Sequence, residues 1–391
     1  MPHYDPIIGL SDFKLLSTRE PGAIELFVEY TGRTACPHCN SEKLRKKEIF
    51  LRRLKHTSIG LQRSVLVLRS HKFQCRSCGR YFNQRFPGIK PGFRCTEPFR
   101  EEVAIKHQEG LSKSASARIF RISSSTVERC FKHYLELKAS HRQNAHCPRV
   151  LGIDEKFFTK KAGYMTTLCD LKKNKVFDLI LGRSELSLKE KLLKIPERHR
   201  CKVIVMDLSE TFRSIARKYF TNALIVADRF HVVKLINLQF LRTWGELDEE
   251  GRKNRGLLSL MRRHPENLKP EQAARLQKYL DKHPPIRAIY EFKQHLMCLV
   301  LARVSTVRQA RKLIPAFLEA IEMLKNSGFK HMKTLGETLE NWQEEIVRMW
   351  RFSKSNSITE GFHNKMEEIL RRAYGMRNFE NFRLRVLNAC A

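Results

Sequence analysis

Apolar residues in the middle of the chain gather in short runs separated by polar stretches, the pattern of strands alternating with helices. Runs at 150–154, 164–170, 176–181, 202–206 and 223–227 predict five strands, and stretches at 185–194, 209–219 and after 229 predict helices. Three strands in succession, followed by strand–helix units, predict a mixed sheet with helices on its faces.

The flanking regions have different patterns. A short apolar run at 64–69 predicts a strand, and residues 98–137 have helical spacing interrupted at Gly110 and at the serines 123–125. From about 240 to 355 only helical periodicity is present, and breaks are expected at Pro265, Pro270, Pro284–Pro285 and Pro315. A last helix is predicted to begin near Ser357.

The net charge of the chain indicates a polyanionic partner. The 391 residues include 74 Lys or Arg and 41 Asp or Glu, a formal net charge of +33, while 42% hydrophobic residues suffice for a folded core. Nucleic acid is the first candidate for a polyanionic partner, and an anionic membrane surface is the second. No run approaches the roughly 18 apolar residues of a spanning helix, and no secretory signal opens the chain. The eleven cysteines, without an export signal, indicate thiols or metal ligands in a reducing cytoplasm.

Four cysteines have the spacing of a zinc site. Cys36 and Cys39 form one Cys-x-x-Cys pair, and Cys75 and Cys78 form the second. Each pair can bind one side of a tetrahedral Zn²⁺, and four thiolates leave no open position for water, so one structural zinc is expected. The gap between the pairs is longer than in the usual zinc ribbon, and a hairpin of basic strands can fill it. His38 is an alternative ligand inside the first pair.

Two segments beside and after this lobe have features of DNA contacts. The first is a basic run of residues whose side chains we expect at phosphates, although a solvated face is the alternative: Lys43, Arg45, Lys46, Lys47, Arg52, Arg53 and Lys55. The second is a helix-turn-helix pattern, with helices over 111–120 and 124–133 and a turn at 121–123. Its apolar seam would be Ala115, Ile119, Ile122, Val127 and Phe131. Its outward residues would be Ser124, Ser125, Thr126, Arg129 and Lys132, with an ordinary helical hairpin as the alternative.

Carboxylates follow two of the predicted strands. Asp154 ends the first strand of the mixed sheet, and Asp207 ends the fourth. In the ribonuclease H-like strand order these strands are adjacent and parallel, so both carboxylates emerge at one edge, about 5 Å apart. Hard oxygen ligands at this distance favour Mg²⁺ or Mn²⁺. A strand-end turn acid is the alternative for either residue alone.

A third ligand is expected from the closing helix. Glu360 stands in its first turn, with Asn364 one turn further on, while Glu344, Glu345, Glu367 and Glu368 compete for the role. Two metal ions held by three carboxylates activate an attacking water or 3′-hydroxyl and stabilise the leaving oxygen in phosphoryl displacement.

Several stretches resemble the insertion-sequence transposases of the L-three type, which belong to the Asp-Asp-Glu, ribonuclease H-like superfamily. They are the two cysteine pairs, 152–155 (GIDE), 228–233 (DRFHVV), 359–365 (TEGFHNK) and 372–378 (RAYGMRN). The resemblance covers nearly the whole chain. It implies an N-terminal zinc finger, a helix-turn-helix and a catalytic domain split by a helical insertion. It places the catalytic carboxylates at Asp154, Asp207 and Glu360, with Asp228 as the alternative to Asp207.

The resemblance also implies a domain plan and a function. The expected parts are an N-terminal segment (1–30), a zinc lobe (31–95), a helix-turn-helix (96–147), a catalytic domain in two parts (148–239 and 356–391) and a helical insertion (240–355). Asp228 and His231 are expected near the metals or at DNA. We expect a prokaryotic, nucleoid-associated DNA transposase that uses Mg²⁺ or Mn²⁺, binds double-stranded transposon ends and target, and assembles as a homodimer or larger oligomer. A non-catalytic DNA-binding regulator and a nuclease without strand transfer are the rival interpretations.

Overall fold

The computed structural model describes residues 4–5, 7–20, 22–140, 146–352, 356–373, 376 and 378–390. Of the stretch 372–378, Tyr374, Gly375 and Arg377 therefore lie outside the described residues. The chain divides into two compact units, one formed by residues 1–141 with 371–375 and one by 142–370 with 376–391. Within the described part, no helix combines the length and apolar character that crossing a bilayer requires.

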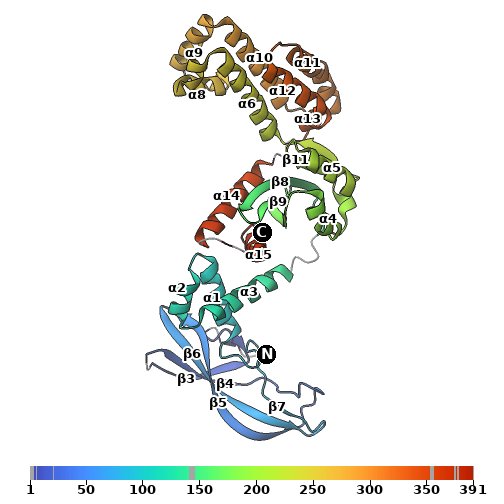
Figure 1. The fold of residues 1–391 in the computed structure, drawn as a ribbon. Helices are drawn as coiled ribbons and strands as arrows, with labels where there is room; N and C mark the ends of the chain where they lie inside the picture. Colours follow the sequence, from blue (N-terminus) through green and yellow to red (C-terminus); the bar gives the residue numbers. More distant parts are fainter. Residues whose placement is uncertain are drawn as a thin grey trace. The chain divides into compact units, whose positions relative to one another are not determined.

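The first unit is built around a twisted sheet with the strand order β3-β4-β6-β5 (Figure 1). Its strands and a small preceding pair are β1 (Tyr4–Asp5), β2 (Leu10–Ser11), β3 (Phe13–Arg19), β4 (Ile24–Tyr30), β5 (Leu44–Ile59), β6 (Gln62–Cys75) and β7 (Tyr81–Asn83). Strand β7 pairs with β6, and β4 runs parallel to β6. Strands β3 and β4, in the segment predicted to precede the zinc lobe, thus belong to the same sheet as the long β5–β6 hairpin, whereas β1 and β2 pair only with each other. The β5–β6 hairpin is the one expected between the two cysteine pairs.

Three helices follow this sheet: α1 (Glu97–Gln108), α2 (Lys113–Phe120) and α3 (Ser124–Ser140). They bury a small core of their own around Phe99, Val103 and Val127. Lys55 of β5 connects the sheet to these helices, because its ammonium donates to the carbonyls of Phe120 and Arg121.

The second unit contains the mixed sheet expected from the sequence, with the strand order β10-β9-β8-β11-β12. Its strands are β8 (Val150–Thr159), β9 (Gly163–Asp170), β10 (Lys175–Leu181), β11 (Val203–Met206) and β12 (Leu224–Ala227). The first three are antiparallel, whereas β8, β11 and β12 are parallel. This is the ribonuclease H-like order.

Helices flank this sheet on both sides, with α4 and α5 on one side and α14 on the other (Figure 1). They are α4 (Glu185–Leu193), α5 (Glu210–Tyr219), α14 (Ser357–Arg372) and α15 (Phe379–Ala389). The insertion between them is all-helical: α6 (Arg229–Leu247), α7 (Glu249–Lys253), α8 (Arg255–Arg262), α9 (Pro270–Lys282), α10 (Pro284–Leu301), α11 (Val307–Lys325), α12 (Lys330–Asn341) and α13 (Gln343–Met349). Single 3₁₀ turns occur at Arg198–Arg200 and Pro265–Asn267.

One of the expected breaks in the insertion is wrong. Pro270 and Pro284 begin helices, as predicted, but Pro315 lies inside α11 without ending it. The lost hydrogen bond is tolerated because α11 begins with a capping box at Thr306 and Gln309 and buries apolar residues on both sides of the proline. The three tryptophans of the chain are buried in this part of the molecule, so they serve the core.

A buried ion pair fastens the insertion to the sheet domain. Arg213 of α5 donates to the Glu345 carboxylate of α13 at 2.8 Å and to the Asn341 carbonyl at 2.6 Å. Its guanidinium also lies 3.6 Å from the centre of the Trp342 ring. The Glu345 side chain is only 2% exposed, so its charge depends on this partner.

We expect Glu345→Gln to lower the free energy of unfolding by about 3 kcal/mol, because the change removes the buried carboxylate partner of Arg213 and leaves its largely buried guanidinium paired with the exposed Glu210 carboxylate instead. Thermal and urea unfolding of the full chain measure this change. Glu210→Gln is the matched control, since Glu210 also contacts Arg213 but is well exposed, and its loss should cost less than about 1 kcal/mol. Equal losses in the two variants would contradict the anchoring role.

Candidate active site and metal centre

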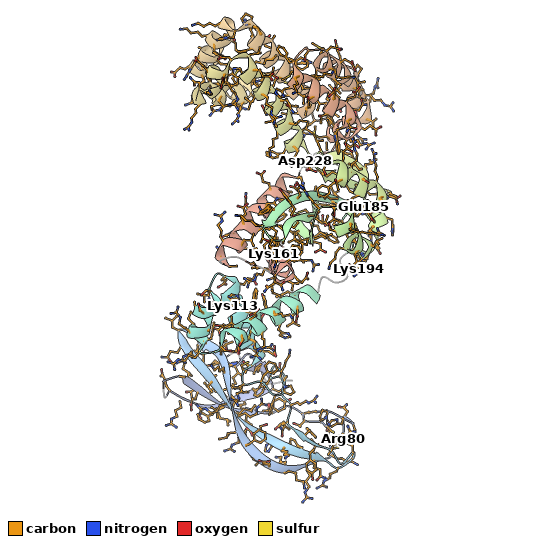
Figure 2. All side chains as sticks on the ribbon, viewed as in Figure 1. Arg80, Lys113, Lys161, Glu185, Lys194 and Asp228 are labelled. Carbon is orange, nitrogen blue, oxygen red and sulfur yellow. The ribbon has the colours of Figure 1, made fainter. Side chains whose placement is uncertain are left out.

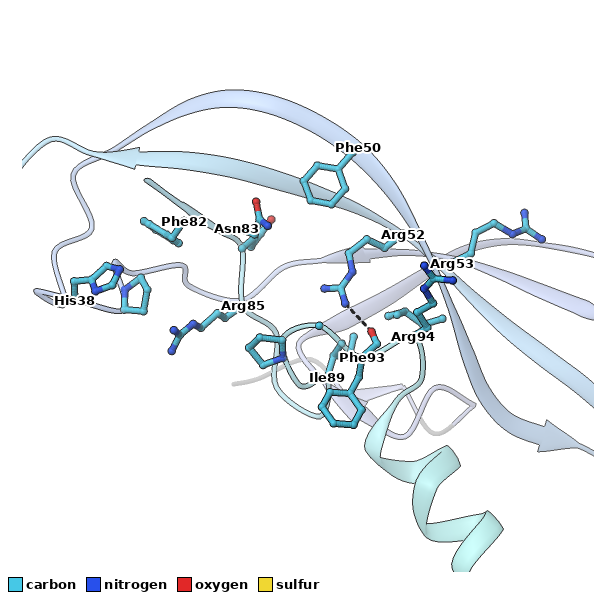
Figure 3. A pocket seen from close by; sticks show the side chains of 15 residues that line it. His38, Phe50, Arg52, Arg53, Phe82, Asn83, Arg85, Ile89, Phe93 and Arg94 are labelled. Atoms are coloured by element: carbon cyan, nitrogen blue, oxygen red, sulfur yellow. Dashed lines mark hydrogen bonds between the residues drawn. The ribbon is translucent and has the colours of Figure 1, made fainter. Parts of the chain in front are cut away.

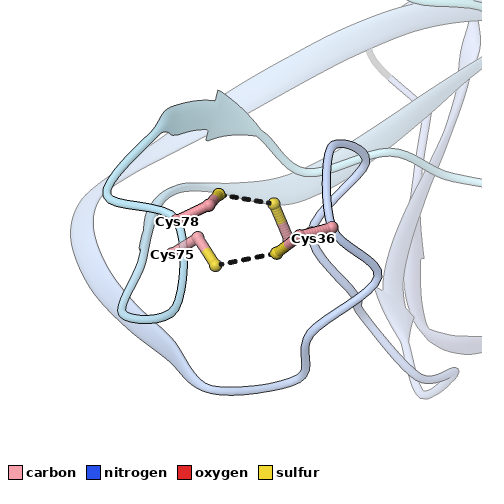
Figure 4. Close-up of side chains that lie close together, drawn as sticks. Cys36, Cys75 and Cys78 are labelled. Atoms are coloured by element: carbon pink, nitrogen blue, oxygen red, sulfur yellow. Dashed lines mark hydrogen bonds between the residues drawn. The ribbon is translucent and has the colours of Figure 1, made fainter.

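The four predicted cysteine ligands come together at the ends of the β5–β6 hairpin. Their sulfurs all lie within 4.8 Å of one another. The Cys36 and Cys78 sulfurs are 3.7 Å apart, and those of Cys39 and Cys75 are 3.5 Å apart (Figure 4). Four sulfurs at about 2.3 Å around a tetrahedral Zn²⁺ would be separated by about 3.8 Å. The cluster therefore fits a four-thiolate zinc ion.

The two cysteine pairs have the same backbone design. In each, the N–H of the residue after the second cysteine donates to the carbonyl of the first at 2.9 Å, and that residue, Asn40 or Gly79, has a positive φ. The backbone N–H groups of Cys78 and Ser77 lower the pKa of the Cys75 thiol to about 6, which favours the thiolate that binds metal. His38 lies outside this cluster, and its Nδ1 contacts Arg80 at 3.2 Å.

The predicted helix-turn-helix is present, but α2 begins two residues later than predicted, at Lys113, and α3 extends seven residues further, to Ser140. Helices α2 and α3 are joined by Arg121 in the left-handed region, and Ser123 caps α3 by accepting the Thr126 N–H at 3.2 Å. Of the outward residues, Ser124, Ser125, Arg129 and Lys132 are exposed and Thr126 is half-buried.

The predicted apolar seam is partly wrong. Val127 and Phe131 are buried, but Ile119 is 53% exposed, and α2 buries Ser116 and Phe120 instead. The difference arises because α2 has only two turns, and the edge-to-face packing of Phe120 on Phe99 fixes its rotation.

The basic run lies on β5, and its members differ in their contacts. Arg45, Lys46 and Lys47 are exposed. Arg53 pairs with the buried Glu25 carboxylate, and half-buried Arg52 donates to the Phe93 carbonyl at 3.1 Å. Arg52 and Arg53 are therefore held by the protein itself, whereas the first three project into solvent.

Three aspartates lie side by side on three neighbouring parallel strands. Asp207 and Asp228 directly follow β11 and β12, but the prediction that Asp154 ends its strand is wrong: β8 continues to Thr159, because its second half stays paired with β9. Ile153 of β8 pairs with Met206 of β11, which pairs with Ala227 of β12. The next residue along the chain is an aspartate in each case, so Asp154, Asp207 and Asp228 stand in one row at the carboxyl ends of β11 and β12, one strand spacing apart. The structure therefore brings together the two predicted aspartate ligands and their alternative.

The first two aspartates of this row have the features of cation ligands. Asp207 Oδ1 is buried and has no hydrogen-bond partner among the described residues. Burial raises the pKa of Asp154 to about 6, and the Asp207 and Asp228 carboxylates add to the effect while His231 opposes it. Burial likewise raises the pKa of Asp207 to about 6. Buried, mutually repelling carboxylates with an unsatisfied oxygen fit a divalent cation.

Asp228 is held differently. It is 1% exposed, and it precedes α6 where this helix leaves the sheet (Figure 2). Its Oδ1 accepts the Asn356 N–H at 3.0 Å, and its Oδ2 contacts His231 Nδ1 at 2.8 Å. This contact raises the pKa of His231, to which the Asp154 and Asp207 carboxylates also contribute. Because both carboxylate oxygens of Asp228 have protein partners, this residue is better suited than Asp207 to holding the neighbouring His231 and Asn356 in position.

Asn356 fixes the closing helix against the sheet, a role that the sequence analysis did not find. Its side-chain amide donates to the Ile153 carbonyl at 3.2 Å, and its oxygen accepts the Thr359 hydroxyl. Gly152 makes room for it, since a Cβ at this position would lie 2.6 Å from Asn356 Oδ1. The glycine of the GIDE stretch thus allows α14 to start beside Asp154.

The first two turns of α14 place one histidine at the aspartate row. His363 Nδ1 lies 4.0 Å from Asp154 Oδ2, and its Nε2 lies 3.0 Å from the Thr167 hydroxyl. Burial lowers the pKa of His363 to about 4, so this ring is neutral. Glu360 lies three residues before His363 and the predicted Asn364 directly follows it, and both side chains are exposed. Glu367 pairs with Lys156 at 2.7 Å instead.

Comparisons with known proteins agree with this geometry. The sequence profile described as a transposase of family ISL3 matches residues 151–386, and that of the helix-turn-helix domain of transposase family ISL3 matches residues 84–135. The chain is also 25% identical over 381 residues to the transposase for insertion sequence element IS1001 of Bordetella parapertussis, covering 94% of this chain and 92% of that protein.

For the cysteine cluster, we expect one zinc ion per chain in the purified protein and none in the double variant Cys36→Ser, Cys39→Ser. Loss of two thiolates leaves too few ligands for a closed tetrahedral site, so the hairpin ends should lose their order and the thermal midpoint should fall. Elemental analysis and thermal unfolding measure both effects. Cys298→Ser is the control, since Cys298 is exposed on α10 and should leave the zinc content unchanged. A zinc-free wild-type chain would contradict the assignment.

Proposed function

The chain belongs to transposase family ISL3, and from this premise we propose that it binds the terminal inverted repeats of an insertion sequence and catalyses metal-dependent cleavage and strand transfer at those ends. The observation that carries the catalytic part is the row of aspartates, in which two buried carboxylates repel each other and Asp207 Oδ1 lacks a partner among the described residues. Family membership supports divalent-metal chemistry on DNA. The proposal extends this to the ions, residues and steps.

Three side chains would hold the catalytic ions. Asp154 and Asp207 would supply oxygens from adjacent parallel strands, and Glu360 would supply a carboxylate from the first turn of α14. Two Mg²⁺ ions, or Mn²⁺, supply at such a site the activation of a water or 3′-hydroxyl and the stabilisation of the leaving oxygen. Asp228 orients His231 toward the row and raises its pKa, which favours the imidazolium form that would offset part of the like-charge repulsion.

DNA recognition is proposed for the first unit. The N-terminus of α3 presents exposed Ser124 and Ser125, and Arg129 and Lys132 lie on its outward face. Exposed Arg45, Lys46 and Lys47 on β5 are proposed to contact phosphates. Because an insertion sequence has two ends, we propose that at least two copies of the chain assemble on the DNA. Zinc in the cysteine cluster would keep the hairpin ends in place.

The catalytic assignment predicts that Asp154→Asn and Glu360→Gln both abolish cleavage and strand transfer on a plasmid carrying the element's own ends, while end binding stays within about twofold. Each change removes a metal ligand without altering the first unit. Gel analysis of cleavage and of joined products, with electrophoretic mobility shifts for binding, measures the outcome.

Glu367→Gln is the matched control, because Glu367 lies about 10 Å further along α14 and pairs with Lys156. It should remain active. Normal cleavage by Glu360→Gln would remove that residue from the site. End binding without cleavage by the wild-type chain would favour the non-catalytic regulator, and cleavage without joining would favour a simple nuclease.

The raised pKa values of Asp154 and Asp207 predict that Mn²⁺ binding weakens by at least roughly tenfold between about pH 7.5 and about pH 5, because the ion must displace protons that both carboxylates take up below about pH 6. In the metal-free protein, lower pH has the opposite effect, because it stabilises the fold. Protonation of Asp154 removes a buried charge, so its contribution to the free energy of unfolding rises as the pH falls through about 6.

Calorimetric titration of Mn²⁺ at the two pH values measures the first effect. Unfolding of metal-free wild-type and Asp154→Asn proteins across the same range measures the second, because the difference between the two chains isolates this carboxyl. An Mn²⁺ affinity that does not change with pH would contradict the burial of these ligands.

A further inference from the structure

A concave pocket of about 560 Å³ lies in the first unit, between strand β5 and the loop that leads from β7 to α1 (Figure 3). Its volume is in the range of sites that hold small organic ligands. Arginines, phenylalanines and an amide line its walls. They are Arg52, Arg53, Arg85, Arg94, Phe50, Phe82, Phe93 and Asn83. Among the lining residues that the structure describes, none is Asp or Glu.

Positive charge converges on this pocket from two segments. Arg52 and Arg53 come from β5, and exposed Arg85 and Arg94 come from the opposite loop. Arg52 is half-buried and held by the Phe93 carbonyl, and burial lowers the pKa of its guanidinium. Arg53 also forms an ion pair with the buried Glu25 carboxylate. Cations brought together in a partly desolvated hollow favour an anion that carries several oxygen acceptors, such as a phosphodiester.

Aromatic rings form the other part of the walls. Phe50 projects from β5, and Phe93 lies on the loop, where Arg100 covers its ring at 4.7 Å. Phe82 packs on Phe73 with the ring centres 5.7 Å apart, which fixes its orientation. Phosphate contacts alone do not require aromatic walls, whereas unpaired bases stack on such rings. In a duplex the bases are stacked on one another, so their faces are not accessible to the rings.

The pocket is also close to the helix-turn-helix along the same strand. Lys55, which donates to the Phe120 carbonyl at the end of α2, is three residues from Arg52, about 10 Å along β5. A DNA end bound by the helix-turn-helix would thus have its adjoining strand within reach of the arginines.

We propose that this pocket binds an unpaired nucleotide of DNA adjoining the bound duplex, with its phosphodiester between the arginines and its base against the phenylalanines. The inference rests on the proposed function for the source of the DNA, but the pocket's binding can be measured without catalysis. The exposed Asn83 amide at the pocket is placed to hydrogen-bond a base edge.

The test uses the full-length, zinc-containing chain and a short fluorescein-labelled oligothymidylate, followed by fluorescence anisotropy. We expect the wild-type chain to bind it, and the variants Phe93→Ala and Arg85→Ala to weaken binding by about tenfold each, the typical effect of one lost base stack. Arg69→Ala is the matched control, since Arg69 is an exposed arginine of the same sheet outside the pocket. It should change binding by less than about twofold.

Several outcomes would overturn the inference. They are failure of the wild-type chain to bind the oligonucleotide, equal weakening by Arg69→Ala and the pocket variants, or equally tight binding of free thymidine monophosphate. Each variant must keep the zinc content and the thermal midpoint of the wild-type chain, so that a loss of oligonucleotide binding can be assigned to the pocket and not to unfolding. Duplex ends are measured in parallel, so that pocket-dependent oligonucleotide binding without end binding would refute the proposed function alone.

Discussion

The parallel register of β8, β11 and β12 is the constraint on which the second unit depends. It places Asp154, Asp207 and Asp228 in adjacent positions at one edge, although three carboxylates at a partly buried edge repel one another. The structure manages this repulsion in two ways: Asp228 is satisfied by the Asn356 backbone and His231, while Asp154 and Asp207 keep raised pKa values. The rest of the domain holds these three strands in place.

Close packing at one glycine completes this arrangement. The absence of a side chain at Gly152 lets Asn356 reach the Ile153 carbonyl, and Asn356 in turn sets where α14 begins. The position of Glu360 is therefore coupled to the aspartate row through a few hydrogen bonds rather than through its own contacts. A helix that started one residue later would turn the Glu360 side chain by about 100° about the helix axis.

The strands and helices of the sheet domain were predictable because each is a short apolar run bounded by polar residues, and the strand order then fixes the positions of Asp154 and Asp207. The cysteine cluster was predictable from spacing alone. The roles of Asn356 and His363 were not, because they depend on the rotation of α14, which periodicity does not determine. Strands β3 and β4 were missed since they join the sheet through the non-local pairing of β4 with β6, and Ile119 was misplaced because a two-turn helix has too few residues to define one face. The assignment of Glu360 and of the DNA contacts stays a prediction.

The helical insertion leaves the sheet at Arg229, directly after Asp228, and the chain returns at Asn356, whose N–H donates to that same aspartate. The two ends of an excursion of roughly 125 residues are therefore tied together beside the catalytic edge, and the entropy of closing such a loop grows only logarithmically with its length. The insertion can accordingly gain or lose helices over evolutionary time without moving the site, because its size and the geometry of the edge are set by separate parts of the chain.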